Sequence, residues 1–256
     1  MRAFAGRTVL VTGGASGIGA AIARRVAGEA GAPIVADVDL EGAEAVAAEL
    51  GARAQHLDVT DPTSWEGLLD VVGDVDVACC NAGVATGEAD IAAVDVERYR
   101  STVAVNLDGI VLGVRALVPR LRRGATIVAM ASLAGLTPMP SDPIYAATKH
   151  AIVGFVRSYA PTLAVNGVRL QAVCPGLVDT PLIRPEARQE LEDVGFPLIP
   201  VEDVAEGLVC AVRSDGTGEA WVVQAGRRPE PYHFRGVPGP RVAGSEGMAP
   251  PGIPGG

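Results

Sequence analysis

Short apolar runs alternate regularly with longer segments of helical spacing, and this alternation restricts the possible folds more than any other feature of the sequence. The longer segments repeat apolar residues three or four positions apart, which is typical of helices that cover a core. The short runs are apolar throughout, as expected of strands buried on both faces of a parallel sheet. The pattern predicts an α/β protein with a doubly wound parallel sheet of about seven strands and helices on both faces. The predicted strands are residues 8–11, 34–36, 54–57, 75–80, 126–130, 168–173 and 220–223, and the predicted helices are residues 18–30, 40–50, 96–121, 145–163 and 201–212, with one more beginning at Pro62.

The chain of 256 residues is long enough for one large domain, and 48% of it is hydrophobic, which is ample for a core. We expect residues 1–226 to form a single domain that contains the functional site. Residues 227–256 are rich in Pro and Gly and cannot build a core, so we expect them to be disordered or draped over the body or a neighbouring subunit. Pro161 is expected to kink or end the helix predicted at 145–163.

The formal net charge of −9 bears on possible partners and location. An acidic surface repels phosphate backbones and anionic lipid heads, so neither nucleic acid nor a membrane is an expected partner. No run approaches the ~18 apolar residues of a membrane span and no secretory signal is visible, so a cytoplasmic location is expected. The cysteines have no C-x-x-C spacing, so we expect small buried hydrophobic residues rather than disulfides or a metal site. They are Cys79, Cys80, Cys174 and Cys210.

A glycine-rich turn, TGGASGIG at residues 12–19, follows the first predicted strand and opens the first predicted helix. Glycines allow a tight turn and a close approach of the backbone to a pyrophosphate, and the helix start supplies free N–H donors. Because the turn has this strand–turn–helix context, a dinucleotide site is favoured over a purely structural turn. The residues assigned to the cofactor here are Gly13, Ser16, Gly17, Ile18 and Gly19.

Asp37 ends the second predicted strand, 18 residues after Gly19. A carboxylate there accepts hydrogen bonds from ribose hydroxyls and repels a 2′-phosphate, and no basic residue occupies the turn, so NAD is expected rather than NADP. A helix N-cap is the alternative role for Asp37, although Asp39 is better placed for it. Asp58 ends the third strand and is expected either to reach the adenine or to act as a turn or capping residue before Pro62.

Tyr145 and Lys149 lie four residues apart on a predicted helix and therefore share a face. A phenol with an ordinary pKa of ~10 is a poor base at neutral pH, but a nearby ammonium favours the phenolate. Tyr145 is therefore the candidate acid/base for an alcohol or a carbonyl. Lys149 is the only lysine beside twenty arginines, which indicates a position that arginine does not serve. A surface pair on a helix is the alternative for this spacing taken alone.

Two further polar residues are candidates. Ser132 follows the strand predicted at 126–130, at the edge where ligands bind in such sheets, and its hydroxyl would bond a substrate oxygen; a loop serine is the alternative. Asn106 interrupts the helix predicted at 96–121, and such an Asn can mark a local break that frees a carbonyl for a water. A plain buried polar residue is the alternative for Asn106.

Taken together and in this order, these residues resemble the short-chain dehydrogenase/reductase family over residues 7–226. The motifs that carry the resemblance are TGGASGIG at 12–19, Asp37, Asp58-Val59, NAG at 81–83, VNLDG at 105–109, ASLAG at 131–135, YAATK at 145–149 and PGLVDT at 175–180. The resemblance implies a single-domain Rossmann-type fold, an NAD cofactor and a catalytic tetrad of Asn106, Ser132, Tyr145 and Lys149. Lys149 would also hold the nicotinamide ribose.

The family resemblance also extends the cofactor site and suggests an assembly. It implies a homotetramer or a homodimer, with the helices from Val96 and from Tyr145 at the main interface. The tail after Arg227 is longer than usual for the family and is a candidate for reaching a neighbouring active site. The residues that the resemblance adds to the cofactor site, beside Tyr145 and Lys149, are Asp58, Val59, Asn81, Ala82, Gly83, Pro175, Gly176, Val178 and Thr180.

The predicted function is hydride transfer between NAD and a secondary alcohol or its ketone, as in alcohol dehydrogenases and carbonyl reductases. Residues 181–200 and 84–91 are predicted to cover the substrate, and their apolar side chains favour a hydrophobic substrate; simple packing of the lid is the alternative. A non-catalytic, NAD-binding redox sensor is a second possible function, and a dehydratase or epimerase is a third, against which the single-domain length argues. The residues assigned to the substrate are Ser132, Ala134, Tyr145 and Leu182.

Overall fold

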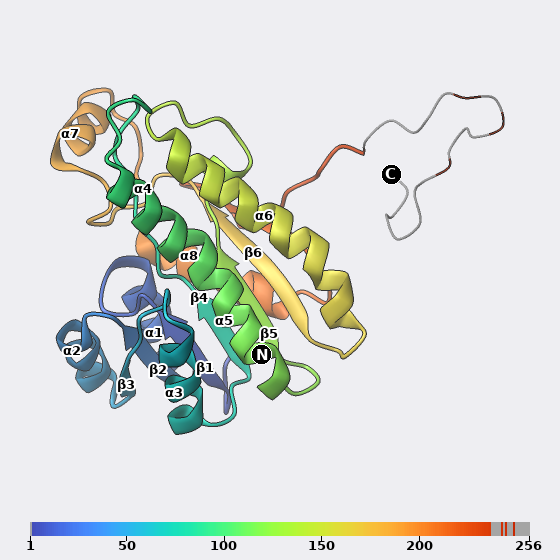
Figure 1. The fold of residues 1–256 in the computed structure, drawn as a ribbon. Helices are drawn as coiled ribbons and strands as arrows, with labels where there is room; N and C mark the ends of the chain where they lie inside the picture. Colours follow the sequence, from blue (N-terminus) through green and yellow to red (C-terminus); the bar gives the residue numbers. More distant parts are fainter. Residues whose placement is uncertain (1, 237–241, 243, 245–247, 249–256) are drawn as a thin grey trace.

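A single twisted sheet forms the centre of the molecule (Figure 1). The computed structural model describes residues 2–236, 242, 244 and 248. The strand order is β3-β2-β1-β4-β5-β6-β7-β8, and every pairing is parallel except that of β8 with β7. The predicted doubly wound parallel sheet is confirmed, with one short additional strand. The strands are β1 (Thr8–Thr12), β2 (Ala32–Asp37), β3 (Arg53–His56), β4 (Val77–Cys80), β5 (Thr126–Met130), β6 (Arg169–Pro175), β7 (Ala220–Val223) and β8 (Glu230–Pro231).

Helices cover both faces of the sheet, and each face has its own apolar cluster. One cluster joins the sheet to α3, α5 and α6, and the other joins it to α1 and α8, with a small cluster between α1 and α2. Figure 1 shows α4, α5 and α6 along one face of the strands. The helices are α1 (Gly17–Gly28), α2 (Leu40–Leu50), α3 (Pro62–Val72), α4 (Val96–Val103), α5 (Gly109–Leu117), α6 (Pro143–Ala164), α7 (Pro185–Asp193) and α8 (Val201–Arg213).

The apolar character of the strands follows from this layering. Val9 and Val11 of β1 point into the cluster under α1 and α8, whereas Leu10 between them points into the cluster under α3 and α5. All three side chains are fully buried, so neither face of the strand tolerates a polar residue. Three of the four cysteines are buried in strands as expected, Cys210 is half-buried, and all four are free.

The structure tests two expectations about the long helices. The helix predicted at 96–121 is interrupted by a π-helical turn, η1 (Ala104–Asp108), and ends in a 3₁₀ turn, η2 (Val118–Arg120). The helix does not end at Pro161, because α6 continues to Ala164. A proline this near the end of a helix removes a single hydrogen bond, which the rest of α6 withstands.

Two elements were not predicted. Helix α7 lies within the segment expected to cover the substrate, and none of its residues is buried. Strand β8 lies in the segment expected to be a tail: Tyr232 donates its backbone N–H to the carbonyl of Ala220, and the guanidinium of Arg157 lies 3.7 Å from the ring centre of Phe234. The start of the tail is thus draped over the body, while most of the tail beyond Gly236 lies outside the described residues.

One described helical stretch, Val96–Arg120, is long and apolar enough by length and composition to cross a membrane. Core helices of soluble proteins pass the same test. Ile110, Val114 and Leu117 of this stretch are buried against the sheet, which explains its apolar composition.

Candidate active site

The candidate site lies where the strand order reverses, between β1 and β4. In open parallel sheets, ligands bind beyond the carboxyl ends of the strands at this point. The predicted site residues follow strands β1 to β6 or lie on α1, the π-turn and α6, so the fold gathers them at one edge of the sheet. Among the described residues, no group of three or more His, Cys, Asp or Glu side chains is placed to hold a metal ion.

The glycine-rich turn between β1 and α1 is held in one tight conformation. Gly13 and Gly17 have positive φ angles of 65° and 51°, which favour glycine. A Cβ on Gly19 would lie 2.0 Å from the carbonyl oxygen of Gly13. The side-chain amide of Asn81 donates to the carbonyls of Thr12 and Gly13 at 3.0 and 3.1 Å, which joins the turn to the end of β4.

The start of α1 fits a pyrophosphate. Ser16 is the N-cap but makes no side-chain hydrogen bond to the first turn, and that turn, which includes Ile18, carries no acidic residue. The backbone N–H donors of the turn therefore remain available to bind an anion. The positive end of the helix dipole also favours an anion there. Thr180 reaches over this turn, with its methyl group 3.4 Å from where a Cβ on Gly17 would lie.

Asp37 is oriented by the backbone around it. Its two carboxylate oxygens accept hydrogen bonds from the N–H groups of Ala15 and Asp39, each at 3.0 Å. Asp39, and not Asp37, caps α2 by accepting a bond from Gly42. The capping alternative for Asp37 is therefore removed, and its carboxylate lies at the end of β2 beside the glycine turn.

Asp58 and Val59 have local structural partners. Asp58 accepts bonds from the N–H and hydroxyl of Thr60 at 2.9 and 2.7 Å, as in the turn alternative, and Asp61 caps α3. The carbonyl of Val59 accepts a bond from the indole of Trp65 at 3.0 Å, and its side chain is buried. These contacts leave the half-buried Asp58 carboxylate at the end of β3.

The NAG segment after β4 lies against the reactive side chains. The N–H groups of Asn81 and Ala82 both donate to the hydroxyl of Thr12. A Cβ on Gly83 would lie 3.4 Å from Oδ1 of Asn106 and 3.5 Å from Nζ of Lys149. The backbone at Gly83 therefore passes within contact distance of two predicted catalytic residues.

Ser132, Tyr145 and Lys149 are brought together. The hydroxyl of Ser132 lies near the phenol of Tyr145. Ser132 also caps the 3₁₀ turn η3 (Leu133–Gly135) by accepting a bond from Ala134. The ammonium of Lys149 is buried, lies 5.4 Å from the centre of the Tyr145 ring and donates to the carbonyl of Met130 at 2.9 Å. The surface-pair alternative for Tyr145 and Lys149 is therefore wrong.

The pKa values of the pair differ from the expectation. Burial raises the pKa of Tyr145 to about 12, against a smaller lowering effect of the Ser132 hydroxyl. Burial likewise lowers the pKa of Lys149 to about 8. The expected lowering of the Tyr145 pKa by Lys149 is absent, because desolvation dominates and the ammonium is directed at the Met130 carbonyl.

Asn106 lies in the π-turn, where the sequence predicted a local break. It is fully buried, and its amide both accepts from the N–H of Val84 and donates to the carbonyl of Val84, each at 2.8 Å. The amide also donates to the hydroxyl of Thr148 at 3.1 Å. Asn106 thus joins the segment after β4 to α6, beside Lys149.

The segment after β6 approaches the site from the other side. Pro175 ends β6, and its carbonyl accepts a bond from Ser132 at 3.4 Å. The N–H of Gly176 donates to the carbonyl of Val223, and Val178 forms a parallel bridge with Ile199. Past Thr180 the contacts become sparse, and Leu182 is 48% exposed.

Asp142 is a site residue that sequence reasoning missed. Its carboxylate is buried and accepts three hydrogen bonds: from the hydroxyl of Thr86 at 2.6 Å, from the N–H of Gly87 at 2.7 Å and from the N–H of Tyr145 at 2.9 Å. It therefore caps α6 and fixes the loop after β4 to the start of that helix. The sequence does contain a signal for the capping role of Asp142. Asp142 and Pro143 stand just before the predicted helix, and an acidic cap followed by proline in the first turn is typical of a helix start.

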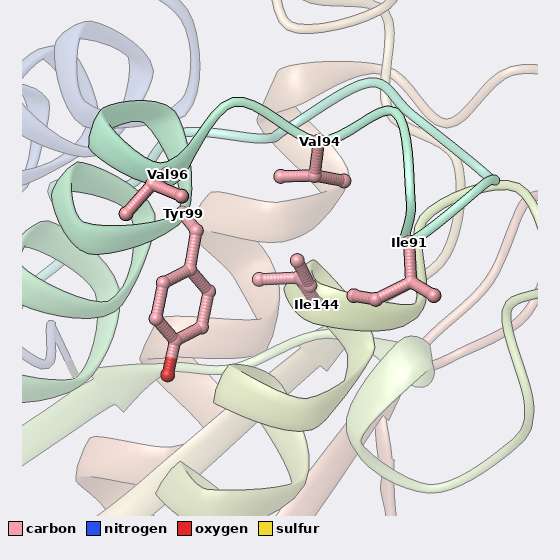
Figure 2. Close-up of a pocket in the computed structure, with 5 residues that line it drawn as sticks. All are labelled: Ile91, Val94, Val96, Tyr99 and Ile144. Atoms are coloured by element: carbon pink, nitrogen blue, oxygen red, sulfur yellow. The ribbon is translucent and has the colours of Figure 1, made fainter.

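An apolar recess of about 250 Å³ lies between the loop after β4, the start of α4 and the start of α6 (Figure 2). Ile144, the neighbour of Tyr145, forms part of its wall. Figure 2 shows the isoleucine, valine and tyrosine side chains that surround the recess, and none of them is charged. The lining residues are Ile91, Val94, Val96, Tyr99 and Ile144.

A family model described as short chain dehydrogenase matches residues 7–191. The chain belongs to the short-chain dehydrogenase/reductase family, whose members bind nicotinamide cofactors, and it is an oxidoreductase of alcohol substrates.

Individual relatives agree with this assignment. The chain is 40% identical to 1-deoxy-11-beta-hydroxypentalenate dehydrogenase of Streptomyces exfoliatus over 70% of each chain. It is also 40% identical to cis-4-hydroxycyclohexanecarboxylate dehydrogenase of Sinomonas cyclohexanicum, over 71% of this chain and 77% of the relative. A 3-alpha-(or 20-beta)-hydroxysteroid dehydrogenase of Mycobacterium tuberculosis is 34% identical over 86% of this chain and 89% of its own.

Solved structures share the fold. A dehydrogenase/reductase from Sinorhizobium meliloti superposes with a TM-score of 0.77 at 26% identity, over 87% of this chain and 95% of that one. BdcA, solved in complex with NADPH, superposes with a TM-score of 0.79 at 24% identity, over 86% of this chain and 94% of that one.

Proposed function

We propose that the protein is an NAD-dependent dehydrogenase that oxidises a secondary alcohol on an apolar, ring-bearing substrate, with Tyr145 as the acid/base. The observation that carries the proposal is the buried ammonium of Lys149, 5.4 Å from the centre of the Tyr145 ring, with the hydroxyl of Ser132 near the phenol. Tyr145 and Ser132 are placed to bind one oxygen atom together. The ring-bearing substrate is supported by relatives that act on a hydroxycyclohexanecarboxylate and on hydroxysteroids.

In this proposal, Ser132 holds the substrate oxygen and Tyr145 takes the hydroxyl proton at its phenol oxygen. When bound, NAD supplies the acceptor for the hydride that leaves the carbinol carbon. Because the pKa of Tyr145 is raised to about 12, its base form is scarce at neutral pH. Oxidation is therefore expected to become faster as the pH rises from neutral toward that value, as long as the protein stays folded.

NAD is proposed over NADP because of Asp37. Its carboxylate is fixed beside the glycine turn by two backbone donors, and a negative charge there repels a 2′-phosphate. The turn and the start of α1 would hold the pyrophosphate through Gly13, Ser16, Gly17, Ile18 and Gly19. Asn81, Ala82 and Gly83 would pack against the cofactor, as would Pro175, Gly176, Val178 and Thr180, while Asp58 and Val59 would lie near the adenine.

We propose further that the described body works as one domain in the cytoplasm and assembles as a homotetramer or homodimer. The support is an apolar outer surface on α4 and α6, where Val96 and Tyr99 are exposed and Phe155 stacks on Tyr159 at 5.7 Å between ring centres. Light scattering of the purified chain reports its assembly directly.

The test of the function is NADH formation over a panel of cyclic secondary alcohols, with NADP as the alternative cofactor. Replacing Tyr145 by Phe is expected to lower kcat by about 10²- to 10⁴-fold, because general acid–base catalysis contributes about that much. Equal activity of the two proteins would show that Tyr145 is not the acid/base. Tight NAD binding without turnover of any alcohol would instead favour a non-catalytic, NAD-binding protein.

A further inference from the structure

The segment that follows Thr180 brings an arginine to the edge of the candidate site. Arg184 is the residue before α7, and its side chain lies over Gly87: the Cδ, Nε and Cζ atoms are 3.6 to 3.7 Å from where a Cβ on Gly87 would lie. Gly87 has a φ of 66° and carries no side chain, so the guanidinium lies beside the loop after β4 with room for a methyl group between them. Two loops that are far apart in the sequence meet at this contact.

The loop at this contact is linked to the backbone of Tyr145. The N–H of Gly87 and the N–H of Tyr145 donate to the same buried carboxylate, that of Asp142. The loop that supports Arg184 is therefore held to the first turn of the helix that carries Tyr145. Hydrogen bonds tie this loop to the catalytic helix, and Arg184, an exposed residue of the segment before α7, lies against the loop.

Arg184 has no partner for its charge among the described residues, since its guanidinium makes no hydrogen bond or ion pair there. Arg188, one turn further along α7, differs in this respect: it pairs with Asp179 at 2.7 Å and also donates to the carbonyl of Thr180. Glu88, the neighbour of Gly87, accepts a bond from the N–H of Asp90 and forms no ion pair with Arg184. The segment thus holds one arginine that is paired within the protein and one exposed arginine whose guanidinium has no partner among the described residues.

We propose that Arg184 is a carboxylate-binding residue of the substrate site, and that the substrate is a hydroxy acid whose carboxylate lies at the opposite end of an apolar ring from the reacting alcohol. This inference rests on the proposed function, because it places the alcohol at Tyr145 and Ser132. A guanidinium presents a planar fork of donors that matches a carboxylate, and such charge-assisted bonds are the strong ones. The apolar side chains of Leu182 and Ala134, both assigned to the substrate, suit a ring between the two polar ends.

The proposal also explains how an acidic protein accepts an anion. The chain has a formal net charge of −9, so a carboxylate approaching the site is repelled by the surface as a whole. A single unpaired arginine at the edge of the site offers a local attraction at the place where the anion has to stop. Binding of a neutral alcohol would gain nothing from this positive charge.

The experiment compares cyclic hydroxy acids with their methyl esters, using cis- and trans-4-hydroxycyclohexanecarboxylate as the first pair of probes. The wild-type enzyme is expected to prefer each acid that it oxidises over the matching ester, mainly through a lower KM. Arg184→Gln is expected to reduce the ratio of kcat/KM for acid over ester by about 10- to 100-fold, since hydrogen bonds between charged groups contribute on that scale. Arg184→Lys is expected to recover part of the ratio, because it restores the charge without the fork.

The matched control is Arg100→Gln. Arg100 is an exposed arginine on α4 that pairs with Glu97 and lies outside the site, so its replacement tests the effect of removing one positive charge in general. The acid-over-ester ratio is expected to be the same in this variant as in the wild type. An equal fall in both arginine variants would show that only overall charge matters, and would overturn the proposal.

The outcomes separate this inference from the function on which it rests. Oxidation of neutral alcohols with no preference for acids, or with a preference that survives Arg184→Gln, would overturn the carboxylate site and leave the dehydrogenase intact. Absence of NADH formation with every alcohol, acid and ester would overturn the proposed function itself.

Discussion

The proposed cofactor side and the proposed substrate side of the site are built in different ways. On the cofactor side, the glycine turn is fixed by backbone contacts, and α1 behind it has six buried residues. On the substrate side, α7 has no buried residue, and the loop after β4 is held by side chains such as Asp142 and Asn106. The cofactor side is therefore rigid through packing, whereas the substrate side depends on a few hydrogen bonds and is freer to vary between related enzymes.

The largest expected effect comes from breaking the cofactor side. Gly19→Ala places a Cβ 2.0 Å from the carbonyl of Gly13 and 2.9 Å from the amide of Asn81, so the turn has to open. The dissociation constant for NADH is expected to rise at least about 100-fold, a loss of about 3 kcal/mol. Fluorescence titration with NADH measures the change.

Gly28→Ala is the matched control for that substitution. Gly28 lies at the other end of α1, and a Cβ there meets nothing within 4 Å. Because Ala favours helix by about 1 kcal/mol, the control is expected to bind NADH normally and to be no less stable than the wild type. Similar NADH affinities for both variants would contradict the rigid-turn interpretation.

The second expected effect concerns the junction between the two sides, where Lys149 is buried. Its pKa is lowered to about 8 in the folded protein, from 10.5 when exposed, so the folded state disfavours the charged form. Below pH 8 this lowers the free energy of unfolding by about 3 kcal/mol, and the cost disappears as the pH approaches 10.5. Lys149→Met is therefore expected to abolish activity and yet raise the stability at pH 7.

Urea unfolding of the wild type and of Lys149→Met, at pH 7 and near pH 10, tests whether the substitution raises the free energy of unfolding. The stability gain is expected to be largest at pH 7 and small near pH 10. A variant that is less stable than the wild type at pH 7 would show that the hydrogen bond to the Met130 carbonyl outweighs the desolvation of the ammonium.

The smallest of the three effects concerns the substrate side alone. Asp142→Asn weakens the bonds to Thr86 and Gly87 and removes a negative charge that raises the pKa of Tyr145. We expect kcat/KM to fall about 10-fold, or about 1.4 kcal/mol, with NADH affinity unchanged. The rise of oxidation rate with pH is expected to begin at a lower pH, because the phenol ionises more easily.

Thr86→Val separates the two roles of Asp142. This variant loses one hydrogen bond to the carboxylate but keeps its charge, so its pH profile is expected to match that of the wild type. A shifted profile in Thr86→Val, or an unshifted one in Asp142→Asn, would mean that the charge of Asp142 does not act on Tyr145.

The sheet and the strand–turn–helix context of the glycine turn could be predicted from the sequence alone, for a physical reason. The sheet, the glycine turn and Asp37 depend on local patterns: apolar runs, glycines at fixed positions and a carboxylate at a strand end. Four residues could be singled out from local sequence patterns. Asn106 is a polar residue within a predicted helix, Ser132 follows a predicted strand, and Tyr145 and Lys149 lie four residues apart on a predicted helix. Their roles remain proposals.

The substrate side was harder to predict because its contacts connect distant segments. Nothing near Asp142 in the sequence indicates that its carboxylate binds Gly87, and nothing near Arg184 indicates that it lies on the same glycine. The pKa of Tyr145 was misjudged because the effect of burial depends on the whole environment and not on the spacing to Lys149. Pro161 was expected to kink or end the helix, but so near the end of α6 the helix tolerates the one hydrogen bond that the proline removes.

The single lysine also gives the molecule an unusual profile toward amine-reactive reagents. Lys149 is the only side-chain amine, and in the folded state it lies behind the site, 3% exposed. An acylating reagent in solution can reach it only when the site opens or the chain unfolds. The rate at which Lys149 is modified therefore reports how often the site opens. Mass spectrometry can measure this rate on the protein without any substitution.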